Sequence, residues 1–232
     1  FIAEDGGKTT ATVTRNTDTT EPLVVTLASS DTGEAAVQQT ITIPAGAFTS
    51  AEFDIDAVAD QFVDATQTVT ITATANAHDD GTDTLDVTNV DTATVTLTIA
   101  DGQISEAGGT TKATVTRNTD TKDDLVVTLS SSDPGEAAVQ QTITIPAGAF
   151  TSAEFDINAV ADQFVDATQT VTITANANAH DEGTDTLDVT NVDTATVTLT
   201  IADGQISEDG GTTTATVTRN TDTKDDLVVT LS

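Results

Sequence analysis

The sequence repeats after 102 residues, and this repeat limits the possible folds more than any other feature. Residues 1–102 align with residues 103–204 without a gap, and about 13 positions differ. Residues 205–232 then match the opening of the second unit with two changes. We therefore expect two full domains, 1–102 and 103–204, followed by the opening strands of an incomplete third repeat, 205–232.

Within each unit, apolar and polar residues alternate in short runs, which is the pattern of strands that bury one face. The second unit contains seven such runs: "KATVTRN", "LVVTLS", "TITI", "AEFDINAV", "TVTITA", "TLDV" and "ATVTLTI". Turn-forming sequences such as "DPG", "PAG" and "DEG" separate them. The pattern predicts an all-β chain of tandem immunoglobulin-like antiparallel β-sandwiches, with about seven strands per unit. Phe150, Phe155 and Phe164 are the unit's only aromatic residues, so its core should be aliphatic.

Charge and composition narrow the class of partner. The formal net charge is −31, from 38 acidic and 7 basic residues. A nucleic-acid partner and an anionic membrane surface are disfavoured because both need a basic face. There is no cysteine, so no thiolate metal site can form. No apolar run approaches the roughly 18 residues of a membrane span, so we expect no membrane insertion in this segment.

Five acidic residues of the second unit lie at strand ends or in turns: Glu106, Asp133, Asp162, Asp166 and Asp203. Because successive strands of a sandwich reverse direction, turns two strands apart lie at the same end. Carboxylates that converge there repel each other unless a hard cation lies among them. Calcium accepts six to eight oxygen ligands in irregular geometry, and magnesium prefers a tighter octahedron. Each residue alone is an ordinary turn residue, but together they favour a calcium site.

The two histidines offer a second candidate metal site. His78 and His180 lie in "AHDDG" and "AHDEG", where nearby carboxylates could join them. One histidine per unit argues against zinc, and a polar hairpin turn is the simpler interpretation.

Several motifs together resemble a Calx-beta domain: "ISEAGGTTKATVTRNTD", "LVVTLSSSDPGEA", "TITIPAGAFTSAEFDINAVADQFVDATQTVTIT" and "ATVTLTIADG". They cover the whole unit twice and the opening of the third. The resemblance implies an immunoglobulin-like sandwich and, in members that bind calcium, a site at one tip beside the next domain. It implies as metal ligands Glu106, Asp133, Asp162, Asp166 and Asp203 in the second unit, and Glu4, Asp31, Asp60, Asp64 and Asp101 in the first.

The chain departs from the family pattern at two places. The closing aspartate run is reduced to "ADG", with Ala202 and Gly204 beside Asp203. The acidic segment reads "VADQFVDATQ", and Asp166 stands where the family has a longer glutamate. We therefore expect one calcium ion per unit, or one tight and one weak ion.

Near-identical tandem units without a nucleophile motif indicate a structural protein rather than an enzyme. We expect an extracellular or cell-surface shaft of an adhesin or filament, stiffened by calcium at the short junction from Asp203 to Glu208. Its partners would be calcium ions and neighbouring repeats or identical chains. The alternative is a calcium-responsive regulatory or binding module of a larger membrane or secreted protein, which predicts more diverged units.

The last stretch, 205–232, holds only two strand patterns and should not fold as a free domain. Three outcomes stay open: the chain continues beyond it, it is disordered, or a neighbouring molecule supplies the missing strands. The first is the interpretation we favour from the sequence.

Overall fold

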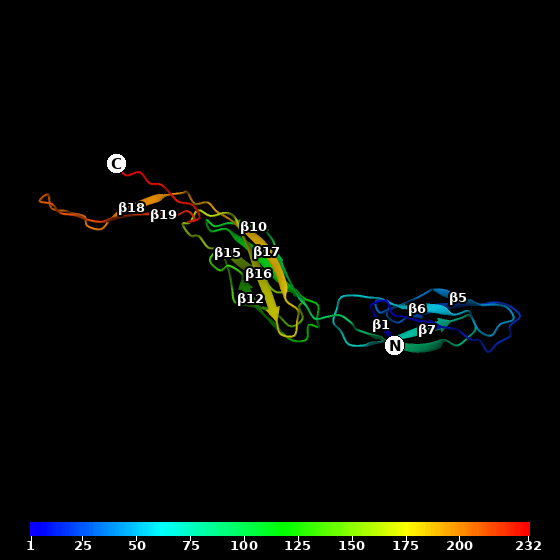
Figure 1. The fold of residues 1–232 in the computed structure, drawn as a ribbon. Helices are drawn as coiled ribbons and strands as arrows, with labels where there is room; N and C mark the ends of the chain where they lie inside the picture. The colour runs from blue at the N-terminus through cyan, green and yellow to red at the C-terminus, as the bar shows by residue number, and fades with distance from the viewer. The chain divides into compact units, whose positions relative to one another are not determined.

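The structure is a computed structural model that describes residues 1–232. Alternating valine, isoleucine and threonine residues form strands throughout the chain. The strands divide into two compact units. Unit 1 comprises Phe1–Ala93 with Asn118–Asp120, and unit 2 comprises Thr94–Arg117 with Thr121–Ser232. Figure 1 labels several strands of each unit. The predicted fold class, all-β with tandem β-sandwiches, is confirmed. The chain has no helix of the length and apolarity that a membrane span requires.

Unit 2 contains a sandwich of two sheets. The five-stranded sheet has the order β10-β17-β16-β12-β14, and the four-stranded sheet has the order β13-β15-β11-β9. The strands are β9 (Val95–Ile99), β10 (Gln103–Ser105), β11 (Thr110–Arg117), β12 (Leu125–Ser131), β13 (Ala137–Val139), β14 (Thr142–Ile145), β15 (Phe155–Ala159), β16 (Gln169–Ala177) and β17 (Gly183–Thr190). The short strands β10 and β13 add to the seven runs that alternation reveals.

The core between these two sheets is aliphatic, as expected. Val115, Ile157 and Ile173 are fully buried in it. Phe155 is the aromatic residue of this core, whereas Phe150 and Phe164 are exposed on loops.

Unit 1 has the same two layers with one strand fewer. Its sheets have the orders β1-β8-β7-β3-β5 and β2-β6-β4. The strands are β1 (Ile2–Ala3), β2 (Lys8–Ala11), β3 (Leu23–Ser29), β4 (Ala35–Val37), β5 (Thr40–Ile43), β6 (Phe53–Ala57), β7 (Gln67–Thr74) and β8 (Gly81–Thr88). Val25, Ile43 and Val69 lie at the centre of its core.

The compact units are offset from the sequence repeats. Strand β9 closes the repeat 1–102, yet it pairs antiparallel with β11, with Ile99 opposite Ala113 and Val95 opposite Arg117. Val95 and Leu97 belong to the core of unit 2. The first repeat therefore ends with a strand that lies in the sandwich formed by the following repeat's residues.

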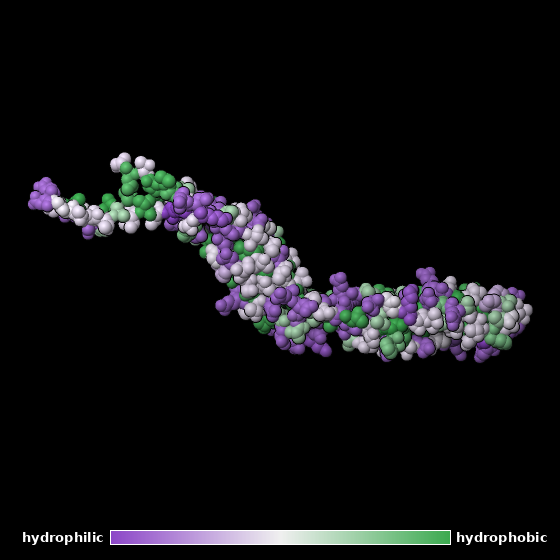
Figure 2. Space-filling model, in the orientation of Figure 1, coloured by the Kyte–Doolittle hydropathy of each residue, from purple (hydrophilic) through white to green (hydrophobic).

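The same offset recurs near the end of the chain. Strand β18 (Val197–Ile201) pairs antiparallel with β19 (Ala215–Arg219) in the register of β9 with β11. No second sheet covers this ribbon, so Val197, Leu199 and Ile201 stay 51–56% exposed. The stretch "LVVTLS" at 227–232 forms no strand. Figure 2 shows apolar side chains gathered on this C-terminal segment, where no second sheet covers them.

Candidate metal centre

Three carboxylates of unit 1 come from three strand ends. Glu4 directly follows β1, Asp60 follows β6 by three residues, and Asp91 follows β8 by three residues. Because β1 and β8 run parallel, with Ile2 opposite Val87, their carboxyl ends lie at the same edge of the sheet. The topology thus places Glu4 beside Val90 and Asp91, although Glu4 and Val90 lie 86 positions apart in the sequence.

The ligand oxygens of these three side chains lie within 4.8 Å of one another. Glu4 is 3% exposed, and its Oε1 accepts a hydrogen bond of 2.8 Å from the backbone N–H of Val90. Oδ1 of Asp60 accepts one of 2.7 Å from the N–H of Phe62. Oδ2 of Asp91 is buried and has no hydrogen-bond partner. Burial of an unpartnered carboxylate oxygen is costly, and a cation at this place would remove that cost.

Electrostatics around the set is uniformly negative. Burial raises the pKa of Glu4, the adjacent carboxyl of Asp91 and the charge of Asp60 raise it further, and the Val90 hydrogen bond opposes them. Burial also raises the pKa of Glu34, together with the charges of Asp64, Asp31 and Asp60. Glu34 is therefore part of the same acidic end of the sandwich. The charged groups that shift these two pKa values are all acidic.

Unit 2 repeats the arrangement with Glu106, Asp162 and Asp193, whose ligand oxygens also lie within 4.8 Å of one another. Glu106 is 3% exposed, and its Oε1 accepts the N–H of Val192 at 2.8 Å. Oδ1 of Asp162 accepts the N–H of Phe164 at 2.6 Å. Both units thus present the same three carboxylates from equivalent strand ends.

Of the five positions expected per unit, the structure brings two into this set: Glu4 and Asp60 in unit 1, and Glu106 and Asp162 in unit 2. Asp31 and Asp133 instead close turns, because their Oδ1 atoms accept the N–H groups of the glycines two residues later.

Asp64 and Asp166 are also held outside the set. Gln67 and Asn89 donate side-chain amide hydrogens to Asp64, and the equivalent amides, including Asn191, donate to Asp166. These partners are neutral, so both carboxylates add negative charge near the acidic end.

The closing aspartates lie apart from the predicted grouping. Asp101, assigned to the first repeat from the sequence, lies in unit 2, where Thr111 Oγ1 donates to its Oδ2 at 3.1 Å. Asp203 makes the same contact with Thr213 at 3.0 Å. The reason is the offset of the strands, since each closing aspartate follows a strand that pairs with the next repeat's residues.

Sequence reasoning missed Asp91 and Asp193, which complete the two sets, and Glu34 and Glu136, which enlarge the negative field. A signal for the aspartates was present in "TNVDTATV". The aspartate of this run, Asp91 or Asp193, follows a strand end by three residues. Like the acids that the sequence analysis names, it recurs after 102 residues.

Asparagine side chains tie together the loops that carry the carboxylates. In unit 1, Nδ2 of Asn118 donates to the carbonyl oxygens of Gln61 and Thr92, each at 2.9 Å. These carbonyls lie next in sequence to Asp60 and Asp91. Asn220 makes the matching bonds to Gln163 and Thr194 at 2.8 and 3.0 Å. A metal ion bound by either set of carboxylates would therefore add a second link between two loops that the asparagine already connects.

The donor chemistry fits a hard cation. Each set offers carboxylate oxygens and no nitrogen or sulfur ligand, which suits calcium, magnesium or manganese. The histidines lie elsewhere: His78 contacts Thr17 Oγ1 through Nε2 at 3.0 Å and the Asn76 carbonyl through Nδ1 at 2.8 Å. His180 makes the same Nδ1 contact with Asn178.

No family model and no curated protein sequence matches the chain. Several solved structures match the chain at low structural similarity. The calcium-binding domain CBD12 of CALX1.1 is 11% identical, with 75% of each chain covered and a TM-score of 0.32. Surface layer protein SbsC, domains 4–9, is 15% identical, with 79% of this chain and 25% of that chain covered and a TM-score of 0.32.

A glycosyl hydrolase family 2 member from Bacteroides cellulosilyticus is 11% identical, with 81% of this chain and 24% of that chain covered and a TM-score of 0.36. These likenesses are low, and none of them assigns a function to this chain.

Proposed function

We propose that the chain is a non-catalytic, extracellular segment of an adhesin or surface-filament shaft in which calcium stiffens consecutive β-sandwiches. The observation that carries the proposal is the repeated set of three carboxylates, with Glu4 and Glu106 almost fully buried and Asp91 Oδ2 without a partner. A buried anionic oxygen without a donor is the feature expected of a metal ligand rather than of a solvated surface acid.

Calcium suits these sets better than other hard cations. Magnesium requires a near-ideal octahedron and keeps its own water, whereas calcium accepts six to eight oxygens in irregular arrangements. Glu4, Asp60 and Asp91 would hold the ion in unit 1, and Glu106, Asp162 and Asp193 in unit 2. The ion would supply positive charge that offsets the mutual repulsion of these groups.

The mechanical effect follows from where the ligands lie. In unit 1, Asp60 and Asp91 belong to two loops that Asn118 already joins through Gln61 and Thr92. An ion shared by both aspartates would fix these loops to each other and to Glu4 at the end of β1. Removing it would leave the apolar core intact, because the carboxylates lie outside that core.

A calcium-responsive regulatory module is the second candidate function. It uses the same carboxylates and predicts that the two sets differ in affinity. The two sets consist of identical residue types at positions 102 residues apart, which favours the structural role.

Calcium titration by calorimetry tests the proposal. We expect about one site per unit with similar affinities, and loss of one site in each of Asp91→Asn and Asp193→Asn. The matched controls are Asp79→Asn and Asp181→Asn, because these exposed aspartates also lie 102 residues apart but belong to neither set. Binding that survives both Asp91→Asn and Asp193→Asn would reject the assigned sites, and two clearly different affinities would favour the regulatory module.

A further inference from the structure

A short piece of the second repeat belongs to unit 1. The segment Asn118–Asp120 directly follows strand β11 and lies in unit 1, whereas the residues on either side of it, Arg117 and Thr121, belong to unit 2. The chain therefore leaves unit 2 for three residues and then returns to it. We call Asn118–Asp120 the latch segment.

Backbone and side-chain hydrogen bonds hold the latch segment to the loop that carries Asp60. The carbonyl oxygen of Asn118 accepts the N–H of Val63 at 2.8 Å, and Thr119 forms a parallel bridge with Val63. Asn118 Nδ2 donates to the carbonyl oxygen of Gln61 at 2.9 Å. Asn118 thus fixes the residues that directly follow a ligand of the metal set.

The same amide nitrogen also reaches the loop that carries Asp91. Asn118 Nδ2 donates to the carbonyl oxygen of Thr92 at 2.9 Å. One nitrogen therefore bridges the peptides next to Asp60 and Asp91, two of the three carboxylates of the set. An amide nitrogen carries two hydrogens, whereas a hydroxyl carries one and a carboxylate carries none. Among short polar side chains, asparagine alone can make this bridge.

A second asparagine connects the same two loops from within the first repeat. Asn89 Nδ2 donates to the carbonyl oxygen of Phe62 at 2.7 Å, and its Oδ1 accepts the N–H of Asp91 at 3.0 Å. The loops are thus connected at two points, one by Asn89 of the first repeat and one by Asn118 of the second. The placement of the ligands in the first repeat therefore depends on a residue that the first repeat does not contain.

The arrangement recurs at the set of unit 2. The carbonyl oxygen of Asn220 accepts the N–H of Val165 at 2.8 Å, in addition to its side-chain bonds to the two loops. Asn191 donates to the carbonyl oxygen of Phe164 at 2.7 Å and accepts the N–H of Asp193 at 3.0 Å. Both metal sets thus have one asparagine from their own repeat and one from the repeat that follows.

We propose that Asn118 and Asn220 are positioning residues that set the calcium affinity of the preceding repeat, so that each repeat binds its ion tightly only when the next repeat follows it. The inference rests on the proposed function, because it concerns the same ion at the same carboxylates. Without the bridge, repulsion between Asp60 and Asp91 drives their loops apart, and the ion must bring them together. Ligands that are already held in place do not carry this cost.

The coupling acts in both directions. If the bridge raises the affinity for calcium, calcium stabilises the bridge by the same factor. An ion in unit 1 therefore strengthens the attachment of the latch segment, whose two ends continue covalently into unit 2. Calcium bound by one repeat thus fastens a segment of the next, which is a route for the proposed stiffening.

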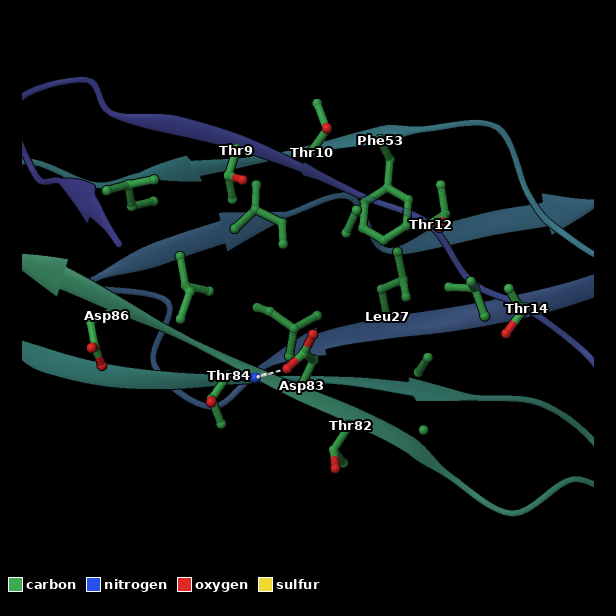
Figure 3. Close-up of a pocket in the computed structure, with 18 of the residues that line it drawn as sticks. Thr9, Thr10, Thr12, Thr14, Leu27, Phe53, Thr82, Asp83, Thr84 and Asp86 are labelled. Carbon is green, nitrogen blue, oxygen red and sulfur yellow. Dashed lines mark hydrogen bonds between the residues drawn. The ribbon is translucent and has the colours of Figure 1, made fainter.

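The bridge lies outside the apolar core, so it can be removed without emptying that core. Figure 3 shows the Phe53 ring and the Leu27 side chain between the layers of unit 1. Neither Asn118 nor a carboxylate of the set lines the space around them. Asn118 is itself half-buried, so its replacement removes hydrogen bonds rather than core packing.

Calcium titration of the 232-residue chain that carries Asp193→Asn tests the proposal, because this substitution leaves only the set of unit 1 complete. In this background, Asn118→Ala should raise the dissociation constant by about five- to thirtyfold. Asn118→Leu, which keeps a side chain of similar length but has no donor, should do the same. Asn220→Ala is the matched control, because it removes the same bridge beside the disabled set, and it should leave the constant unchanged. Equal constants for Asn118→Ala and Asn220→Ala would overturn the proposal.

Thermal melting separates positioning from a purely structural role. A structural role lowers the melting temperature of unit 1 equally in calcium and in chelator. Coupling requires Asn118→Ala to cost more in calcium than in chelator, so equal losses would also overturn the proposal.

The titrations also distinguish this inference from the proposed function. If the unsubstituted chain binds no calcium, or if binding survives both Asp91→Asn and Asp193→Asn, the proposed function fails and this inference fails with it. If those substitutions abolish binding but Asn118→Ala does not weaken it, only the role of the latch segment is rejected.

Discussion

Residues 8–15 of unit 1 and residues 110–117 of unit 2 have nearly the same sequence but different structures. In unit 2 the whole segment is strand β11, whereas in unit 1 the strand stops at Ala11. Thr111 is 2% exposed, and its equivalent Thr9 is exposed. The difference coincides with β9, which pairs with β11 and has no counterpart beside β2. A strand of this sandwich thus depends on the neighbour it pairs with as well as on its own alternation.

The largest expected difference in the free energy of unfolding is between equivalent substitutions in β9 and in β18, which have the same sequence. Leu97→Ala should lower the free energy of unfolding of unit 2 by about 2–5 kcal/mol, because it leaves a cavity in a filled core. Leu199→Ala should change it by less than about 0.5 kcal/mol, because this side chain is half-exposed. Denaturant unfolding of both variants measures this, and equal losses would contradict the environments described for the two strands.

Calcium should stabilise both units alike. At a free concentration of 100 times the dissociation constant, one site contributes about 2.7 kcal/mol. We expect Asp91→Asn to abolish this gain for unit 1 and Asp193→Asn for unit 2, because each completes one set of carboxylates. Calorimetric melting with calcium and with chelator measures the gain. An unchanged melting profile in chelator would argue against a metal site in either unit.

The two equivalent glycines should respond differently to the same substitution. Gly183→Ala should destabilise unit 2 by about 1–3 kcal/mol, because the new Cβ collides with the backbone of β9. Gly81→Ala should be neutral or slightly stabilising, because open space surrounds it and alanine restricts the unfolded chain. Thermal melts of the two variants provide the comparison, and similar losses would show that unit 1 is not open there.

The smallest expected effect is a pH dependence in the absence of metal. The pKa of Glu34 and of Glu136 is raised above the ordinary 4.5, chiefly by burial and then by neighbouring aspartates. A raised carboxyl pKa means that the folded state binds more protons, so stability falls as pH rises from about 4.5 through the folded pKa. Denaturant unfolding in chelator should show this fall, and Glu34→Gln with Glu136→Gln should reduce its slope. Calcium should oppose it, because the ion favours the ionised carboxylates.

Much of the fold follows from the sequence alone. The alternation in runs such as "TVTITA" and "ATVTLTI" places Val171, Ile173, Val95 and Leu97 in a core, and the structure buries all four. Period-two alternation is sufficient because a strand in a two-layer sandwich has one buried face. The repeat also implies that any acidic set found in one unit recurs in the other, as Glu4 and Glu106 do.

Two features were decided by tertiary structure. The sequence repeat ends after β9, but β9 packs on β11 of the following residues, and no local pattern reveals which sheet a strand joins. The acidic set depends on the same long-range pairing. Asp91 meets Glu4 because β1 and β8 run parallel, whereas Asp101 follows β9 into unit 2 and bonds to Thr111. Strand periodicity is a local property, but which strand ends meet is set by pairing between residues far apart in the chain.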